Sequence, residues 1–192
     1  MQAETLQGGF SDAPRDAAAA FRAVMEALAR PGTIQHLAGV TPPLPLSPAA
    51  GAVLLTLCDI DTPVHLAGAA DCDAVRGWLA FHTGAPVTGP AHAMFAVGTW
   101  EALLPLAHYP VGTADYPDRS ATLIVEMPVL EAQGAVLTGP GIRESAALSL
   151  PDADMLAANH ARFPLGLDFL FTCGDRVAGL PRSTAIAAKE TV

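Results

Sequence analysis

Arginine and aspartate side chains at the ends of predicted elements are the groups in this sequence best suited to binding or catalysis. Arg30 and Arg182 each stand beside a proline, in ARPG and LPRST, and Asp168 lies in the otherwise apolar segment FPLGLDF. A carboxylate in such a segment needs a hydrogen-bond donor, because burying it unpaired is costly. Two arrangements are open: Arg182 pairs with Asp168 as part of the fold, or both side chains line a pocket for a phosphate-bearing ligand.

The stretch LTGPGIRES, residues 137–145, is typical of a strand that enters a tight turn. Gly139 and Gly141 match the first two glycines of a dinucleotide-binding motif, but Glu144 stands where the third glycine belongs and would oppose a pyrophosphate. A dinucleotide fold is therefore not expected. The turn is either a corner of the fold or a place where free backbone N–H groups, beside Arg143, bind one anion.

Asp59 is a further candidate, since it stands with Asp61 just before Thr62 and Pro63 in CDIDTPVHL. Carboxylates at such positions commonly close a turn by accepting hydrogen bonds from nearby backbone groups. A turn role and a functional role are both open for Asp59. Its neighbour Cys58 lies on a predicted buried helix and is expected to serve packing.

The histidine, cysteine and lysine positions predict that the protein uses no metal and no cofactor. The six histidines show no HxH, HxxxH or HExxH spacing, and the three cysteines form no CxxC pair. Lys189 is the single lysine in the chain. A P-loop needs a lysine after its glycine-rich turn, and a pyridoxal-phosphate enzyme needs one in its core. Lys189, close to the end of the chain, suits neither.

Composition limits the classes of partner. The formal net charge is −9 and the nine arginines are scattered, so binding to nucleic acid is not expected. The longest apolar run, around residues 51–55, is far shorter than the ~20 residues that cross a bilayer. The first ten residues lack the pattern of a secretory signal, so a cytoplasmic location is expected. Only 15% of residues are charged, which suggests that partner subunits cover some apolar surface.

Hydrophobic periodicity predicts one α/β domain over residues 1–192, with a mixed sheet flanked by helices. Helix 11–32 should begin near Pro14 and end at Pro31-Gly32, with Phe21, Val24, Met25 and Leu28 on one face. The segments 167–173 and 176–180 predict a hairpin, which makes the sheet mixed. Helices are also expected in 47–59, 73–84, 100–109 and 151–163, and strands in 33–39, 62–68, 92–98, 121–127 and 135–139.

The order of these segments resembles the PhnH family, the H subunit of the bacterial carbon–phosphorus lyase system for phosphonate use. The similarity covers roughly residues 9 to 186. Its segments are FRAVMEALARPGT, LTLCDIDTPVHL, FHTGAP, YPDRSATLIVEM, LTGPGI, NHARFPLGLDFLF and AGLPRST.

The resemblance implies a fold similar to the large domain of pyridoxal-phosphate-dependent transferases, without that cofactor. It also implies a homodimer that joins the G, I and J subunits and acts with the L subunit. The implied role is that of an accessory, non-catalytic subunit. The system to which it belongs forms a ribose 1-phosphonate 5-triphosphate from ATP and an alkylphosphonate, with release of adenine.

The predicted binding residues combine the family motifs with Arg143. Ser183 stands where the family more often has threonine, a change that keeps the hydroxyl. The alternative to the subunit role is a stand-alone binder or enzyme that acts on a phosphate-bearing small molecule through an arginine-lined pocket. The residues predicted to bind a ligand or partner are Arg30, Asp59, Gly139, Gly141, Arg143, Asn159, Asp168 and Arg182.

Overall fold

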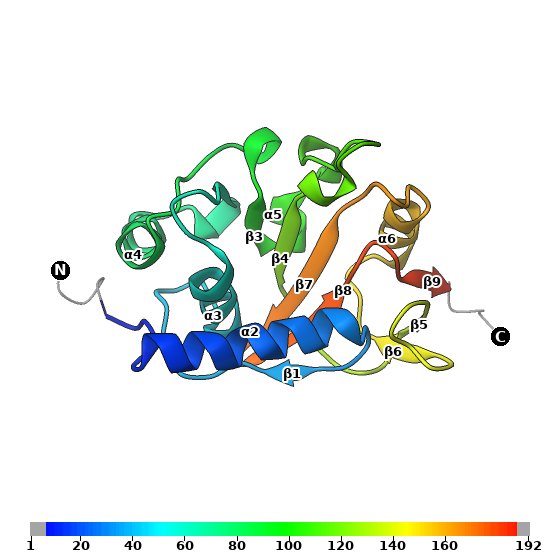
Figure 1. Cartoon of the computed structure of the whole chain (residues 1–192), viewed down its shortest axis with the longest axis horizontal. Coiled ribbons are helices and arrows are strands. Elements are labelled where there is room, and N and C mark those ends of the chain that lie inside the picture. Colours follow the sequence, from blue (N-terminus) through cyan, green and yellow to red (C-terminus); the bar gives the residue numbers. More distant parts are fainter. Residues whose placement is uncertain (1–6, 188–192) are drawn as a thin grey trace.

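The computed structural model of the chain describes residues 7–187, and its centre is a six-stranded mixed sheet (Figure 1). The strand order is β1-β8-β7-β4-β3-β2. Strands β2, β3, β4 and β7 are parallel to one another, while β8 is antiparallel to both β7 and β1. This confirms the predicted mixed sheet and its hairpin. The strands are β1 (Gln35–His36), β2 (Val64–Leu66), β3 (Phe95–Thr99), β4 (Thr122–Glu126), β7 (Asp168–Cys173) and β8 (Arg176–Leu180).

Five α-helices accompany these strands within the described residues, and the ends of α2, α3 and α4 follow the predicted signals. Ser47 caps α3 by accepting a hydrogen bond from the N–H of Ala50 at 3.2 Å. Gly84, in the left-handed conformation, ends α4 as predicted. The expected helix 100–109 is shorter, because Pro105 interrupts it. The helices are α2 (Ala13–Ala29), α3 (Pro48–Leu57), α4 (Asp73–Thr83), α5 (Trp100–Leu103) and α6 (Ala153–His160).

The sheet separates two hydrophobic cores, because alternate residues of each strand point to opposite faces. On β4, Ile124 belongs to one core, whereas Leu123 and Val125 belong to the other. Phe169 and Phe171 on β7 stack at 6.0 Å on the second face. Helices α2, α3 and α4 contribute side chains to the first core, and α5 and α6 to the second.

The buried face of α2 differs from the predicted one. Phe21 and Met25 are half exposed, while Ala20, Val24 and Ala27 are buried. The reason is a close approach of α2 to β8, with which the helix packs directly. A Cβ at Gly179 of β8 would lie 2.7 Å from the carbonyl oxygen of Ala27. Small side chains permit this contact, so the larger apolar residues of α2 face outward.

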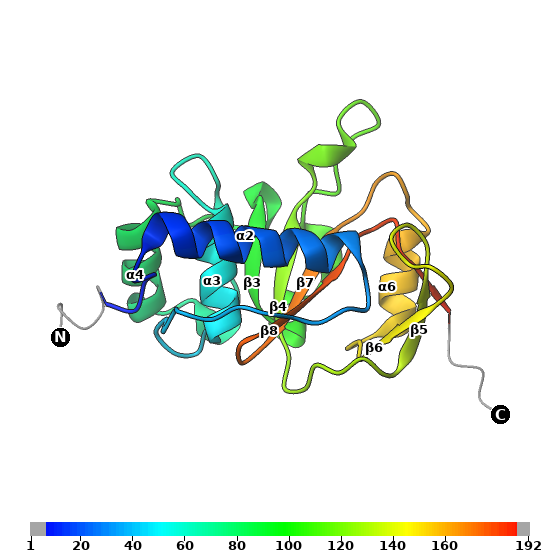
Figure 2. The same cartoon turned by 60° about the horizontal axis from the view of Figure 1, so that its bottom comes forward.

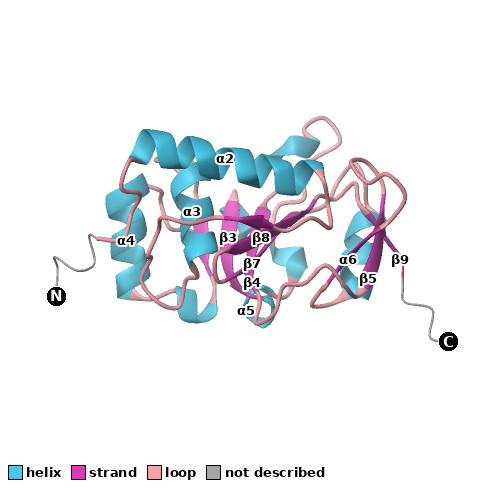
Figure 3. Ribbon diagram, turned by 90° about the horizontal axis from the view of Figure 1, so that it is seen from below, coloured by secondary structure: helices cyan, strands magenta, loops and turns pink. Residues whose placement is uncertain are grey.

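A second sheet of three antiparallel strands, which the sequence did not predict, lies with α6 at one end of the molecule (Figure 3). It consists of β5 (Ala135–Thr138), β6 (Ala146–Leu148) and β9 (Ala185–Ala187). Within this sheet β9 pairs antiparallel with β5. Lys189 lies outside the described residues. No helix in the described part of the chain is long and apolar enough to cross a membrane.

Candidate functional site at the Asp168–Arg182 pair

Three of the sequence motifs meet at one cavity of about 340 Å³. It lies where β7 begins and β8 ends, at the edge of the main sheet that holds the amino-terminal ends of the parallel strands. The segments YPDRS, FPLGLD and LPRS, which are far apart in the sequence, each contribute to its wall. The lining residues are Pro117, Asp118, Phe163, Pro164, Asp168, Pro181, Arg182 and Ser183.

Asp168 and Arg182 form an ion pair in the wall of this cavity. The backbone N–H of Arg182 donates to Oδ1 of Asp168 at 2.8 Å, and the side-chain Nη2 donates to Oδ2 at 2.5 Å. The two side chains are 22% and 13% exposed, respectively. The sequence left open whether Arg182 pairs with Asp168 or whether both side chains line a pocket. In the structure the two side chains pair with each other and also line a pocket.

Arg182 also reaches the loop before β4, since its Nη1 donates to the carbonyl oxygen of Pro117 at 2.6 Å. With Nε bonded to Asp168 at 3.2 Å, all three guanidinium nitrogens have protein partners. The carboxylate balances the charge, and each of the three nitrogens already donates one hydrogen bond within the protein. This geometry favours a positioning role for Arg182 over capture of a phosphate.

The loop held by Arg182 projects from the body of the protein and is the green loop beyond β4 in Figure 2. An antiparallel bridge between Val111 and Ser120 closes its base. Near its tip Tyr116 is 50% exposed, and the guanidinium of Arg119 stacks over the ring at 4.0 Å. A rigid, half-exposed aromatic side chain is a common anchor in protein interfaces. We call residues 111–120 the projecting loop.

Asn159 supports the same site from beneath. Its side chain is buried; Nδ2 donates to the carbonyl oxygen of Leu167 at 2.9 Å, and Oδ1 accepts from the N–H of Leu167 at 2.8 Å. These two bonds fasten the end of α6 to the residue before Asp168. Asn159 therefore acts on the site through the backbone and does not line the cavity.

The remaining predicted residues lie elsewhere. Arg30 is exposed and pairs with Glu26 at 3.0 Å, and the exposed Arg143 is absent from the cavity wall too. Asp59 closes a turn, with its Oδ1 accepting from the N–H of Asp61 at 2.9 Å. The arginines do not converge on one pocket. Whether any of these residues binds a ligand or partner stays a prediction.

The Gly-Pro-Gly turn packs against the end of α2. Gly139 and Gly141 both have positive φ angles, and a Cβ at Gly141 would lie 1.9 Å from the carbonyl oxygen of Ala29. Only glycine fits such a close approach of two backbones. The turn is therefore a corner of the fold, and its proposed anion site stays a prediction.

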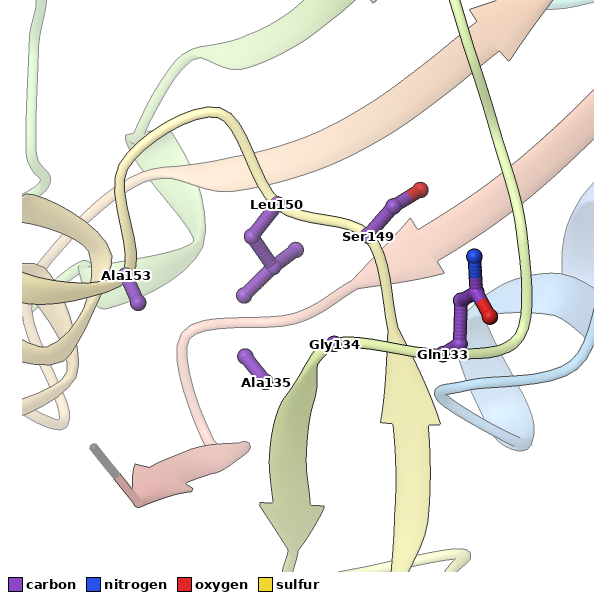
Figure 4. A pocket seen from close by; sticks show the side chains of 6 residues that line it. All are labelled: Gln133, Gly134, Ala135, Ser149, Leu150 and Ala153. Atoms are coloured by element: carbon purple, nitrogen blue, oxygen red, sulfur yellow. The ribbon is translucent and has the colours of Figure 1, made fainter. Parts of the chain in front are cut away.

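A wider cavity of about 600 Å³ beside β5, β6 and α6 offers little chemistry (Figure 4). Its lining includes Gln133, Ser149 and Leu150 but no ionisable side chain. Within residues 7–187 there is also no group of three or more histidine, cysteine, aspartate or glutamate side chains arranged to hold a metal ion. Sequence reasoning overlooked Glu126, the last residue of β4, whose only signal was its place at a strand end.

The molecule is thus an α/β protein whose candidate site is built from three motif segments at one edge of a mixed sheet. The chain belongs to the PhnH family of bacterial phosphonate metabolism proteins, whose family model matches residues 8–187. It is 42% identical to the α-D-ribose 1-methylphosphonate 5-triphosphate synthase subunit PhnH of Rhizobium meliloti (strain 1021), over 96% of this chain and 97% of that protein. It is 31% identical to HtxG of Stutzerimonas stutzeri, whose name assigns it to the C-P lyase subunits, over 92% of this chain and 88% of that protein.

Proposed function

We propose that the chain is an accessory subunit of a carbon–phosphorus lyase system. In this role it supports the formation of α-D-ribose 1-methylphosphonate 5-triphosphate from ATP and a phosphonate, with release of adenine. The observation that carries the proposal is the similarity to a subunit of that synthase along almost the full length of both chains. The match to a second protein named for C-P lyase supports the same role.

A non-catalytic part in this transferase reaction fits the site. The guanidinium of Arg182 is bonded to Asp168 and Pro117, so the cavity offers a fixed wall rather than a free cation. The net charge of −9 would also repel a nucleoside triphosphate or a phosphonate from the isolated chain. The partners that supply the chemistry in this proposal are the G, I, J and L subunits.

The proposed docking surface for these partners is the Asp168–Arg182 cavity together with the projecting loop. Tyr116 and Phe163 are half exposed there, and three prolines stiffen the wall. A homodimer, a cytoplasmic location and a fold related to the large domain of pyridoxal-phosphate-dependent transferases are parts of the same proposal.

Complementation tests the role directly. A phosphonate-using bacterium that lacks its own PhnH gene is expected to regain growth on methylphosphonate when it expresses this chain together with its native partner genes. The affinity-tagged chain should also retain the G, I and J subunits through purification. A purified chain that binds ATP or methylphosphonate at micromolar concentration by calorimetry, and retains no partner, would instead support a stand-alone binder.

A further inference from the structure

A second cavity, of about 560 Å³, lies at the opposite edge of the main sheet from the Asp168–Arg182 pair. It sits outside the carboxyl ends of the parallel strands β3 and β4, the place where open α/β sheets bind their ligands. Its volume falls in the range of small-molecule sites. The lining residues are Pro45, Ser47, Thr99, Trp100, Glu101, Glu126, Met127, Pro128, Pro151 and Gly174.

Glu126 places a half-buried carboxylate in this cavity. Its Oε1 accepts from the N–H of Ser47 at 2.7 Å, and its Oε2 accepts from the hydroxyl of Thr172 at 3.0 Å. Each oxygen retains acceptor capacity for a further donor. Burial raises the pKa of Glu126, so the ionised form lacks solvation that a ligand could replace.

The other lining groups leave this charge uncompensated. Glu101, in the first turn of α5, adds a second, exposed carboxylate to the lining. The lining contains no lysine, arginine or histidine, and no ion pair involves either glutamate in the described part of the chain. A phosphate or phosphonate would therefore be repelled, while a cation would be attracted.

Much of the remaining lining of this cavity is apolar. Trp100, Met127 and the three prolines form this apolar part, and Trp100 is 6% exposed. An apolar stem can pack on it while its cationic head donates hydrogen bonds to Glu126 and Glu101. An indole ring also attracts a cation placed over its face.

We propose that this sheet-edge cavity binds an ammonium or guanidinium group carried on an apolar stem. The cation donates to Glu126 and Glu101, and the stem contacts Trp100. The group can belong to a free small amine or to a lysine or arginine side chain of a partner protein. The site is independent of the proposed subunit role, because its binding chemistry requires no phosphonate.

Titration of the purified full chain tests the proposal. The probes are n-butylguanidinium, 1,4-diaminobutane and, as an anion of opposite charge, methylphosphonate. The indole N–H signal of Trp100 is followed by NMR, with that of Trp78 as an internal reference, because Trp78 is fully buried in the other core. The cations are expected to shift the Trp100 signal saturably, and methylphosphonate is expected to leave it unchanged.

Two variants and one matched control complete the test. Glu126→Gln should weaken cation binding about tenfold or more, since a charge-assisted bond is lost, and Glu101→Gln about twofold. Glu144→Gln removes an equal charge from an exposed position outside the lining and should leave binding unchanged. Glu101 is exposed, so its variant keeps the test informative even if Glu126→Gln does not fold. Absence of a saturable shift, an equal shift with methylphosphonate, or equal affinity in all variants overturns the proposal.

The two sources of the cation are separated by competition. If a partner side chain occupies the cavity, n-butylguanidinium should release that partner from the tagged chain, and Glu101→Gln should weaken its retention. If the ligand is a free amine, the cation shifts Trp100 equally in the isolated chain and in the complex. If the tagged chain retains no partner, the subunit role fails, but the titration of the isolated chain can still show cation binding. The subunit role and the cation site are therefore tested separately.

Discussion

Gly141 and Ala29 come from distant parts of the sequence, and their backbones touch so closely that a Cβ on Gly141 would lie 1.9 Å from the carbonyl oxygen of Ala29. The φ angle of Gly141 is 80°, in the region that favours glycine. The Gly-Pro-Gly turn thereby joins the three-stranded sheet to the end of α2. This contact explains the turn without any ligand.

Gly141→Ala is expected to lower the free energy of unfolding by about 2 kcal/mol or more, because a left-handed conformation and a backbone clash add together. Urea denaturation followed by circular dichroism measures the change. Gly174→Ala is the matched control, since Gly174 has a φ of 60° with no atom within 4 Å of an added Cβ. Equal losses in the two variants would contradict the role of the Ala29 contact.

Arg143→Ala tests whether the Gly-Pro-Gly turn has a binding role in addition to its structural role. Arg143 is exposed, so its removal should change the free energy of unfolding by less than about 0.5 kcal/mol. If the arginine serves an anion or a partner, growth on methylphosphonate or retention of partner subunits should fall nonetheless. Normal growth and normal retention would leave the turn as a corner of the fold only.

Asp168→Asn should destabilise the protein by roughly 2–4 kcal/mol, because it leaves the largely buried guanidinium of Arg182 without its counter-charge. Thermal and urea unfolding report this loss. Glu26→Gln breaks the exposed pair with Arg30 and should cost less than about 0.5 kcal/mol. Limited proteolysis of Asp168→Asn should also cut the projecting loop faster, since Arg182 holds Pro117. Unchanged cleavage would contradict the positioning role of the pair.

Tyr116→Ala tests the projecting loop as a docking element. The ring is 50% exposed, so the isolated variant should keep its thermal stability while its retention of partner subunits falls at least about tenfold, as for an interface anchor. Phe81→Ala, at a similarly exposed aromatic residue on α4, serves as the control. Equal retention by both variants would place the docking surface elsewhere.

The pKa of Glu126 predicts a pH dependence of stability. Because burial raises this pKa above its ordinary value near 4.5, the folded state binds a proton more tightly than the unfolded state. The stabilising effect of that proton is complete below the unfolded pKa and is lost as the pH rises through the folded pKa. Relative to Glu126→Gln, the unmodified protein should therefore lose stability as the pH rises above about 4.5, in urea unfolding at a series of pH values. If the free energies of unfolding of the two proteins change with pH in parallel, the raised pKa of Glu126 is contradicted.

Local signals were sufficient for much of the fold. Pro14, the Pro31-Gly32 pair and Gly84 marked helix ends correctly, and short continuous apolar runs located β4, β7 and β8. The outward face of α2 could not be predicted, because its orientation depends on the contact between Ala27 and Gly179, which are far apart in the sequence. The strands β6 and β9 have three residues each, too few to carry a periodic signal.

The candidate site, like the fold, could be predicted only in part from the sequence. The need of Asp168 for a partner followed from its apolar neighbours, and Arg182 was correctly named as a possible donor. The role of Pro117 was not visible, since a backbone carbonyl carries no residue-type signal. Glu126 was missed because a glutamate at the end of a strand is ordinarily solvated, and only the fold places it beside the first turn of α3.

The short outer strands of the main sheet restrict how this protein joins others. The edges are β1, with two residues, and β2, with three, and Val64 of β2 is bridged further by Val87. Few unpaired backbone groups are left for a neighbour to extend the sheet by strand addition. The same feature leaves little of the main sheet open to edge-to-edge aggregation. In the complex proposed above, side chains would then provide most contacts with a partner, so that specificity rests on a few anchor residues whose single substitution can abolish binding.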